Sequence, residues 1–165
     1  MFCVGHPTLH RLFPQCSQSH SSPVTKCVSL GLISTGVNVA IRVLSADDSD
    51  MMRSAIRRTL DEADGIKVVG EASSFAATMQ LIADVKPDVL LFDLHLAEKR
   101  HFAPALVKSQ LVCVSHVLAV SFSNDREAQD LAESYGAKLL LDKMALFEEL
   151  VPAIMNCASA EHAAG

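Results

Sequence analysis

Acidic, hydroxyl and ammonium side chains stand directly after short apolar runs at several points in this sequence. Asp47 and Asp48 follow one such run, and Asp93 follows another. Ser121 and Lys143 follow two later ones. A carboxylate can attack a phosphoryl group or bind a divalent cation, and a hydroxyl and an ammonium can hold phosphoryl oxygens. Together these residue types predict phosphoryl-transfer chemistry.

Three carboxylates held close together repel one another, so they take up protons or bind a cation. Mg2+ prefers hard oxygen ligands, which makes Asp47, Asp48 and Asp93 candidate ligands. Each residue alone has a plainer interpretation, because an Asp after a strand is usually a cap or turn residue and a lone Lys is usually a solvated charge. Their joint position after apolar runs favours the functional interpretation.

The apolar runs have the length of buried strands. They cover Ile41–Ala46, Ile66–Glu71, Val89–Phe92, Val117–Val120 and Leu139–Leu141. Between them, apolar residues recur at three- and four-residue steps, which predicts amphipathic helices. This alternation predicts an α/β fold, a doubly wound parallel sheet with helices on both faces. The carboxyl ends of parallel strands share one edge, where ligands bind, so the polar residues should meet there.

The predicted helices are bounded by capping and breaking residues. Ser49 or Asp50, Ser73 or Ser74, and Asn124 or Asp125 are the candidate N-caps of three of them. A long loop is expected from Leu94 to Pro104, followed by a weak helix near Ala105–Ser109. Pro152 predicts a kink or a late start in the last helix, over Leu146–Met155.

Charge is distributed unevenly along the 165 residues. Residues 1–39 hold no Asp or Glu and carry a net charge of +2, whereas residues 40–165 carry −7. Such an acidic body argues against a nucleic-acid surface, which needs clustered Lys and Arg. Residues 40–158 are therefore expected to form the folded domain. Residues 1–39 are expected to be a disordered extension or a mis-assigned start, and residues 159–165 a frayed tail.

Apolar runs and cysteines bear on the compartment. No run reaches the roughly 18 residues that indicate a membrane-spanning helix, so no membrane contact is expected. The cysteine count of five is odd, and Cys113 and Cys157 lie in apolar segments. We interpret these two as buried, reduced thiols of a cytoplasmic protein.

Four segments carry a resemblance to a known family. They are Val43–Ser49 (VLSADDS), Pro87–Leu94 (PDVLLFDL), Ala119–Asn124 (AVSFSN) and Gly136–Lys143 (GAKLLLDK). Together they resemble the receiver domain of bacterial two-component response regulators, most of all the receivers of regulators with a helix-turn-helix output. The resemblance implies a flavodoxin-like (βα)5 fold, with five parallel strands in the order 2-1-3-4-5.

The resemblance also assigns roles to the acidic residues. It implies that Asp93 is the phosphoacceptor of a phosphoprotein that forms an aspartyl phosphate. Mg2+ would be bound by Asp93, by Asp48 directly, by Asp47 largely through water, and by the backbone carbonyl of His95. The side chains of His95 and His101 are interpreted as solvated loop residues rather than metal or proton-transfer groups.

Other positions keep or break the family pattern. Ser121 takes the position of the switch hydroxyl, and Lys143 that of the Lys that holds the phosphoryl group. The residue after the switch hydroxyl is the bulky Phe122, which could narrow access to the acceptor. Leu140 replaces the switch aromatic, Met144 replaces a Pro, and the usual Pro-Gly turn after the acceptor is missing.

The resemblance implies a receiver in phosphorelay signal transduction. Its partners would be a histidine kinase or phosphotransfer protein and a downstream protein target, and it could form a homodimer. Eleven residues follow Ile154, too few for a helix-turn-helix module. We therefore expect signalling by protein contacts without direct nucleic-acid binding, and no enzymatic activity beyond the receiver's own phosphorylation and dephosphorylation.

Two alternatives remain beside this reading. A phosphorylation-independent, receiver-like interaction module is favoured by Phe122, Leu140 and the unusual loop. A phosphatase of the haloacid-dehalogenase type is disfavoured, because its D-x-D pair would need a second Asp where this chain has His95.

Overall fold

Strands and helices alternate along the computed structural model, which describes residues 39–98 and 102–162. The strands are β1 (Ile41–Ala46), β2 (Ile66–Ala72), β3 (Val89–Asp93), β4 (His116–Ser121) and β5 (Leu139–Asp142). The helices are α1 (Asp50–Asp61), α2 (Phe75–Val85), α3 (Leu94–Glu98), α4 (Pro104–Leu111), α5 (Arg126–Ser134) and α6 (Leu146–His162). Each predicted strand is present close to its expected bounds.

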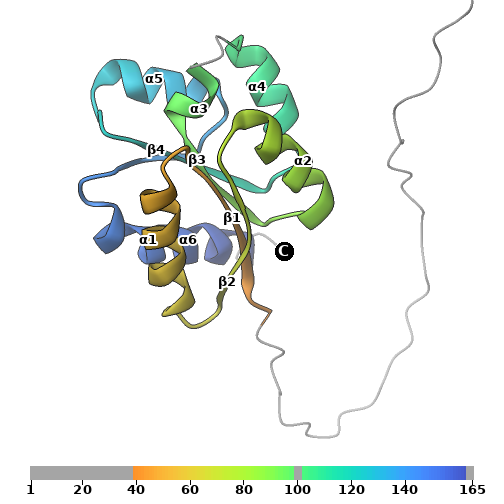
Figure 1. Ribbon diagram of the computed structural model, residues 1–165, viewed down its shortest axis with the longest axis vertical. Helices are drawn as coiled ribbons and strands as arrows, with labels where there is room; N and C mark the ends of the chain where they lie inside the picture. The colour runs from red at the N-terminus through yellow and green to blue at the C-terminus, as the bar shows by residue number, and fades with distance from the viewer. Residues whose placement is uncertain (1–38, 99–101, 163–165) are drawn as a thin grey trace, which may run out of the picture. The chain divides into compact units, whose positions relative to one another are not determined.

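The strands form one parallel sheet in the order β2-β1-β3-β4-β5 (Figure 1). This order confirms the predicted flavodoxin-like, doubly wound arrangement. Near the carboxyl edge of the sheet, Asp93 pairs with Val120 and Ser121 pairs with Asp142. The register therefore brings the ends of β3, β4 and β5 to one edge.

Every residue of the central strand β3 is buried, as expected for a strand covered on both faces. Its side chains alternate between two apolar clusters. Leu90 and Phe92 belong to a cluster with residues of α2, α4 and α5. Val89 and Leu91 belong to a second cluster with residues of α1 and α6. Figure 1 shows the same division, with α1 and α6 on one face of the sheet and α2, α4 and α5 on the other.

Polar side chains cap three helices as predicted. The Ser49 hydroxyl accepts a hydrogen bond from the Met52 N–H, and the Ser74 hydroxyl accepts one from the Ala77 N–H, each at 3.3 Å. Asp125 caps α5 through the Ala128 N–H at 2.9 Å. Each bond satisfies a backbone donor that the helix itself leaves unpaired.

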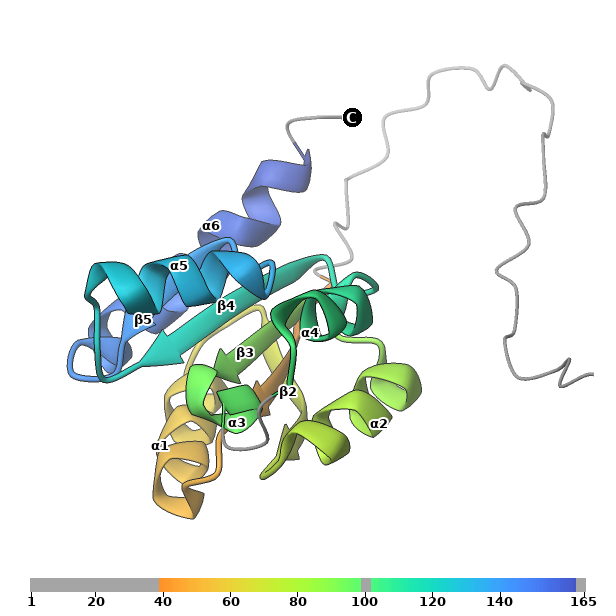
Figure 2. The same cartoon turned by 90° about the horizontal axis from the view of Figure 1, so that it is seen from above.

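The expected loop after β3 is partly wrong, because Leu94–Glu98 forms the short helix α3 at the end of β3 (Figure 2). The Asp93 carboxylate accepts a hydrogen bond from the His95 N–H at 3.1 Å, as an N-cap residue does. Leu94 and Leu96 are buried in the cluster beside α2. A capping Asp and two buried leucines therefore order the segment that sequence periodicity left irregular.

The expectation of a buried Cys113 is also wrong, since this thiol is exposed. Cys113 lies between α4 and β4, where only Leu111 and Val114 face the core and Val112 is 81% exposed. The turn between α4 and β4 thus exposes Val112 and Cys113 although their neighbours in the sequence are apolar. Cys157 on α6 is half-buried, and burial raises the pKa of its thiol while the Lys138 ammonium opposes that shift.

The last helix runs without interruption through Pro152 and continues to His162, beyond the expected domain end at residue 158. The predicted extension, residues 1–39, lies outside the described residues except for Val39, and so does His101. No helix among residues 39–98 and 102–162 is long and apolar enough to cross a membrane.

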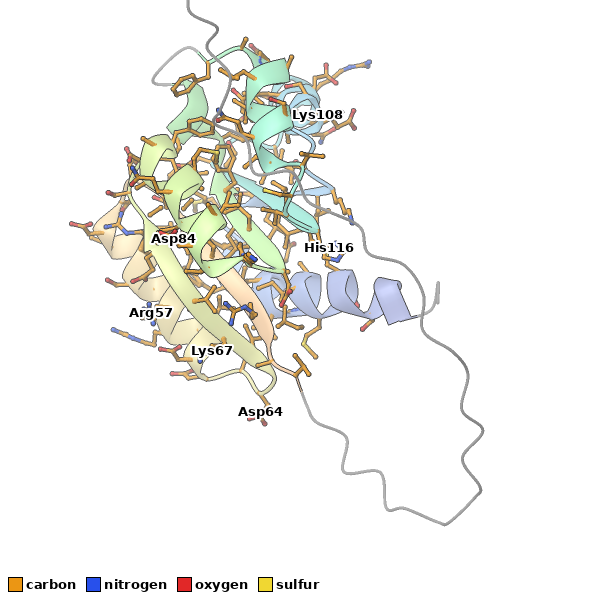
Figure 3. The ribbon with its side chains drawn as sticks, turned by 90° about the vertical axis from the view of Figure 1, so that its right-hand side faces the viewer. Arg57, Asp64, Lys67, Asp84, Lys108 and His116 are labelled. Atoms are coloured by element: carbon orange, nitrogen blue, oxygen red, sulfur yellow. The ribbon has the colours of Figure 1, made fainter. Side chains whose placement is uncertain are left out.

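Exposed charges of both signs lie on the outer elements. Figure 3 shows Asp64 in the turn before β2, Lys67 on β2, Asp84 on α2 and Lys108 on α4. His116, which begins β4, is 3% exposed, and its Nδ1 lies 2.8 Å from the Lys138 ammonium nitrogen. Because Lys carries only donors, this imidazole accepts a hydrogen bond at Nδ1.

Candidate functional site

The sheet brings the predicted chemical groups to one edge. Asp47 follows β1, Asp93 ends β3, Ser121 ends β4 and Lys143 follows β5. These four residues are 2%, 2%, 2% and 6% exposed, whereas Asp48 is exposed. Burial of so many polar groups is unfavourable unless they satisfy one another, and their mutual contacts show how they do so.

Three carboxylates converge at this edge. Asp47, Asp48 and Asp93 each offer an oxygen, and these oxygens all lie within 4.8 Å of one another. Close carboxylates favour a cation or a proton between them. The donor set consists of hard oxygens only, which suits a divalent cation such as Mg2+ better than a transition metal. The grouping predicted from the strand ends is therefore present.

The Lys143 ammonium joins two of these carboxylates. Its Nζ lies 2.7 Å from Asp47 Oδ2 and 3.1 Å from Asp93 Oδ2. All three side chains are at least nine-tenths buried. One ammonium beside three carboxylates leaves the group with a formal excess of two negative charges, a charge that a divalent cation would balance.

Each buried carboxylate uses its second oxygen to hold the local backbone. Asp47 Oδ1 accepts from the Ser49 N–H at 2.8 Å, and Asp93 Oδ1 accepts from the His95 N–H at 3.1 Å. The Oδ2 atoms are thereby turned toward Lys143. The Lys143 N–H also donates to the Ser121 carbonyl at 2.8 Å, which fixes the start of the Lys143 loop on β4.

Burial raises the pKa of the Asp93 carboxyl above its ordinary value of 3.8. The Lys143 ammonium opposes this shift, the Asp47 carboxylate adds to it, and hydrogen bonds from His95 and Lys143 oppose it. Because the pKa is raised, the Asp93 carboxyl holds its proton more strongly in the folded protein than the same group would in water. A bound cation would offset the same penalty.

Ser121 stands on the other side of Asp93 in the strand order. Its buried hydroxyl oxygen accepts a hydrogen bond from the Ser123 N–H at 3.1 Å. Ser121 and His95 line one side of a cavity of about 490 Å³ that α5 residues line on the other. A hydroxyl in this position can contact a group attached to Asp93 without leaving the sheet edge.

The resemblance assigns roles to two further positions, His95 and Leu140. The backbone carbonyl of His95 as a metal ligand stays a prediction, although His95 is adjacent through its N–H bond to Asp93. Leu140, at the position expected to hold a switch aromatic, is half-buried against the cluster of α2, α4 and α5. An aliphatic side chain there cannot make the ring rotation that an aromatic switch requires.

Sequence reasoning missed two contacts of the site. The Arg53 guanidinium donates to the Asp47 carbonyl oxygen at 2.6 Å and also pairs with Asp50. The Phe122 ring lies over Lys143, with Nζ 5.1 Å from the ring centroid. Arg53 is one helical turn beyond Asp50 on α1, and this spacing is the signal that could have found its ion pair.

Known proteins with similar sequences and structures are response regulators. The response regulator GacA of Pseudomonas viridiflava is 43% identical over 56 residues, which are 34% of this chain. The probable transcriptional regulatory protein NarL of Mycobacterium tuberculosis is 30% identical over 118 residues, 72% of this chain. The solved signal receiver domain of the putative response regulator NarL from M. tuberculosis covers 73% of this chain at 29% identity, with a TM-score of 0.64. The chain contains a response-regulator receiver domain.

The chain spans only part of the length of these curated relatives, but nearly all of the solved receiver domain. The chain spans 26% of GacA and 55% of NarL, but 97% of the solved NarL receiver. The response regulator domain of Thermotoga maritima CheB, at 24% identity and a TM-score of 0.61, shares the fold, and 96% of it is covered. No protein-family model matches the chain.

Proposed function

We propose that this receiver domain accepts a phosphoryl group on Asp93 in two-component, phosphorelay signal transduction. The observation that carries the proposal is the Lys143 ammonium, which lies within 3.1 Å of Asp93 and 2.7 Å of Asp47 in a buried cluster. A nucleophilic carboxylate beside a fixed ammonium suits a group that gains negative charge on phosphorylation. The response-regulator relatives support the same reading.

The residues present fit Mg2+. Asp47, Asp48 and Asp93 would hold the ion, and the His95 carbonyl would complete the protein ligands. When bound, Mg2+ supplies charge neutralisation to the phosphoryl oxygens. Asp48, being exposed, is the carboxylate most open to an incoming ion.

The chain's own residues have distinct tasks in the transfer. An Asp93 carboxylate oxygen forms a bond to phosphorus, and the bond from phosphorus to the donor's leaving atom breaks, with the electron pair going to the donor. Lys143 holds phosphoryl oxygens by charge, and the Ser121 hydroxyl donates a hydrogen bond to another. Movement of Ser121 toward the phosphoryl group would then alter the face formed by α5 and β5.

We assign the receiver to residues 40–158, with residues 1–39 and 159–165 outside it. Its partners are a histidine kinase or phosphotransfer protein and a downstream target protein, with a homodimer as a further form. We place the protein in the cytoplasm of a bacterium, since the similar proteins are bacterial. The domain would contact proteins rather than nucleic acid, and its chemistry would be limited to its own phosphorylation and dephosphorylation.

Leu140 favours a second candidate function, a receiver-like interaction module that phosphate does not switch. Its half-buried aliphatic side chain removes the usual ring rotation between Ser121 and the α5–β5 face. NMR spectra of α5 amides with saturating beryllium fluoride and Mg2+ separate the two functions. Unchanged α5 resonances at full occupancy would support the second candidate.

The phosphoacceptor proposal is tested by incubating the protein with acetyl phosphate and Mg2+ and measuring its intact mass. The expected result is a mass gain of one phosphoryl group in the wild type and none in Asp93→Asn. Asp48→Asn should slow labelling strongly, while Asp61→Asn, an exposed acid away from the cluster, should behave as wild type. Equal labelling of wild type and Asp93→Asn would refute the proposal.

A further inference from the structure

Three reactive side chains gather at the edge of the sheet opposite the acidic cluster. His116 begins β4, Lys138 precedes β5 and Cys157 lies on α6. The imidazole Nδ1 of His116 lies 2.8 Å from the Lys138 ammonium nitrogen, and this ammonium acts electrostatically on the Cys157 thiol. The proposed phosphoryl transfer uses none of the three, so this grouping is free to have a chemistry of its own.

His116 has the placement of a fixed base. It is 3% exposed, and its backbone N–H donates to the Asp88 carbonyl at 3.1 Å, which holds the residue at the start of β4. The Lys138 backbone N–H donates to the Val117 carbonyl at 2.8 Å, so strand pairing holds both partners. Because Nδ1 accepts a hydrogen bond, the neutral imidazole carries its own proton on Nε2. Nδ1 is therefore within reach for proton transfer from the Lys138 nitrogen.

Lys138 has the environment of a nucleophile. The residue is exposed and lines a cavity of about 230 Å³ between α5 and β5, which has room for a small acyl group. Within residues 39–98 and 102–162, its ammonium contacts the His116 imidazole and pairs with no carboxylate. A carboxylate partner would favour the charged ammonium, which has no lone pair, whereas a neutral imidazole can take a proton from the amine.

We propose that Lys138 is an acylation site, with His116 as the base and a small acyl phosphate as the acyl donor. The site is distinct from Asp93, because it lies at the amino ends of β4 and β5 and Asp93 lies at the carboxyl end of β3. The inference does not depend on the proposed phosphoacceptor function. Its product is an amide that has lost the positive charge and keeps one N–H for the imidazole.

The transfer balances with these groups alone. The Lys138 ammonium first loses one proton to solvent, and the neutral amine keeps an N–H directed at His116 Nδ1. The amine lone pair forms a bond to the acyl carbon, and the bond from that carbon to the phosphate oxygen breaks, with the electron pair leaving on phosphate. His116 Nδ1 takes the remaining extra proton from nitrogen and returns it to solvent.

The test compares lysines within one protein. The protein is incubated with acetyl phosphate and excess EDTA, without Mg2+, and acetylation of each lysine is followed over time by peptide mass spectrometry. Lys138 should react about tenfold faster than the exposed Lys67 and Lys108, which is below the roughly 100-fold that a base contributes in a complete active site. Equal rates at the three lysines would overturn the proposal.

Two variants separate the roles of the neighbours. His116→Asn keeps a hydrogen-bond acceptor on a side chain that cannot take a proton, so the Lys138 rate should fall to that of Lys67. Cys157→Ser removes the thiol and should leave the Lys138 rate as in the wild type, because the acyl group passes directly to nitrogen. An unchanged rate in folded His116→Asn would overturn the base, and a reduced rate in Cys157→Ser would overturn the direct transfer.

Because His116 is buried, the melting temperature of His116→Asn verifies that the variant folds. A measurement on the wild type in concentrated urea needs no variant, and there Lys138 should react at the same rate as Lys67. A preference for Lys138 that persists in urea would show that the folded pair does not cause it and would also overturn the proposal. Acetyl and phosphoryl groups differ in mass, so failure at Lys138 and failure at Asp93 are separate results.

Discussion

Asp93 is a carboxylate that the fold buries beside a second carboxylate and a single ammonium. The Asp47 carboxylate and burial both favour its protonated form, and the Lys143 ammonium opposes them. The balance leaves the pKa of Asp93 raised, so the native state is less stable with this group charged than with it neutral. On the proposed function, Asp93 lowers the stability of the fold and in return supplies the phosphoacceptor.

Asp93→Asn should therefore increase the free energy of unfolding at pH 7, by about 1 kcal/mol for each unit of raised pKa. A raised folded-state pKa gives stability that is fully present below the ordinary Asp value of 3.8 and is lost as pH rises through the folded-state pKa. The gain from Asn should thus vanish below about pH 3.8. Urea unfolding of the wild type and of Asp93→Asn, at pH 7 and again below pH 3.8, measures this difference in the free energy of unfolding.

Asp61→Asn is the matched control, because Asp61 is exposed at the end of α1. Its replacement should change stability by less than about 0.5 kcal/mol at either pH. A loss of stability at pH 7 in Asp93→Asn would contradict the assigned sign.

Asp48 is the exposed member of the three carboxylates, so its replacement removes a ligand without leaving a buried charge. Mg2+ should stabilise the wild type by about 2.7 kcal/mol at a concentration 100 times its dissociation constant. Asp48→Asn should lose most of this increment, whereas Asp50→Asn, two residues along the chain, should keep it. Thermal melting in a Mg2+ series gives the comparison, and an equal increment in Asp48→Asn would exclude the assigned ligand.

Among the secondary-structure elements, those with one uniform residue pattern are predicted best from the sequence. Val89–Phe92 is uniformly apolar, and this segment forms β3 at the centre of the sheet. The polar residues after each run could be placed at one edge because parallel strands share their direction. The ring of Phe122 and the guanidinium of Arg53 could not be placed, since their contacts depend on side-chain conformations that no spacing specifies.

Short elements between strands are where prediction is weakest. The helix α3 has five residues, too few to display a helical period. Its order depends on the capping by Asp93 and on the burial of Leu94 and Leu96, which are properties of the folded sheet edge. Cys113 shows the opposite case, because an apolar local sequence does not bury a residue that lies in a turn.

Lys86 ends α2 in a left-handed conformation with a φ of 46°, and it is the non-glycine residue with positive φ among residues 39–98 and 102–162. A side chain there is unfavourable by roughly 1 kcal/mol, and Gly avoids the clash. Lys86→Gly should raise the free energy of unfolding by up to about 1 kcal/mol. Lys67→Gly, at an exposed position in β2, should lower it instead. Guanidinium unfolding of both variants tests this contrast, and a destabilised Lys86→Gly would contradict it.

For the whole molecule, the sheet separates two apolar clusters that share only the strands between them. Adjacent residues of β3 supply both, Leu90 to one cluster and Leu91 to the other. Each cluster is a full layer of the core, because each lies between the sheet and its own helices (Figure 1). Stability should therefore depend on both faces.

Leu90→Ala and Leu91→Ala should each lower the free energy of unfolding by about 2–5 kcal/mol, since each leaves a cavity in a packed cluster. Leu139 lies on the edge strand β5 and is 43% exposed, so Leu139→Ala should lower the free energy of unfolding by less than either of the other two substitutions. Denaturant unfolding monitored by circular dichroism measures all three. A small effect at Leu90 or Leu91 would show that one face does not contribute to the cooperative unit.

The bond between Lys143 and Asp47 joins residues 96 positions apart in the chain. During synthesis, β1 and β3 leave the ribosome well before β5. Until β5 pairs with β4, the emerging chain holds its acidic side chains without the ammonium that accompanies them in the finished protein. On the proposed function, a nascent receiver therefore gains its phosphate chemistry only with its last strand, and unfinished chains are excluded from signalling.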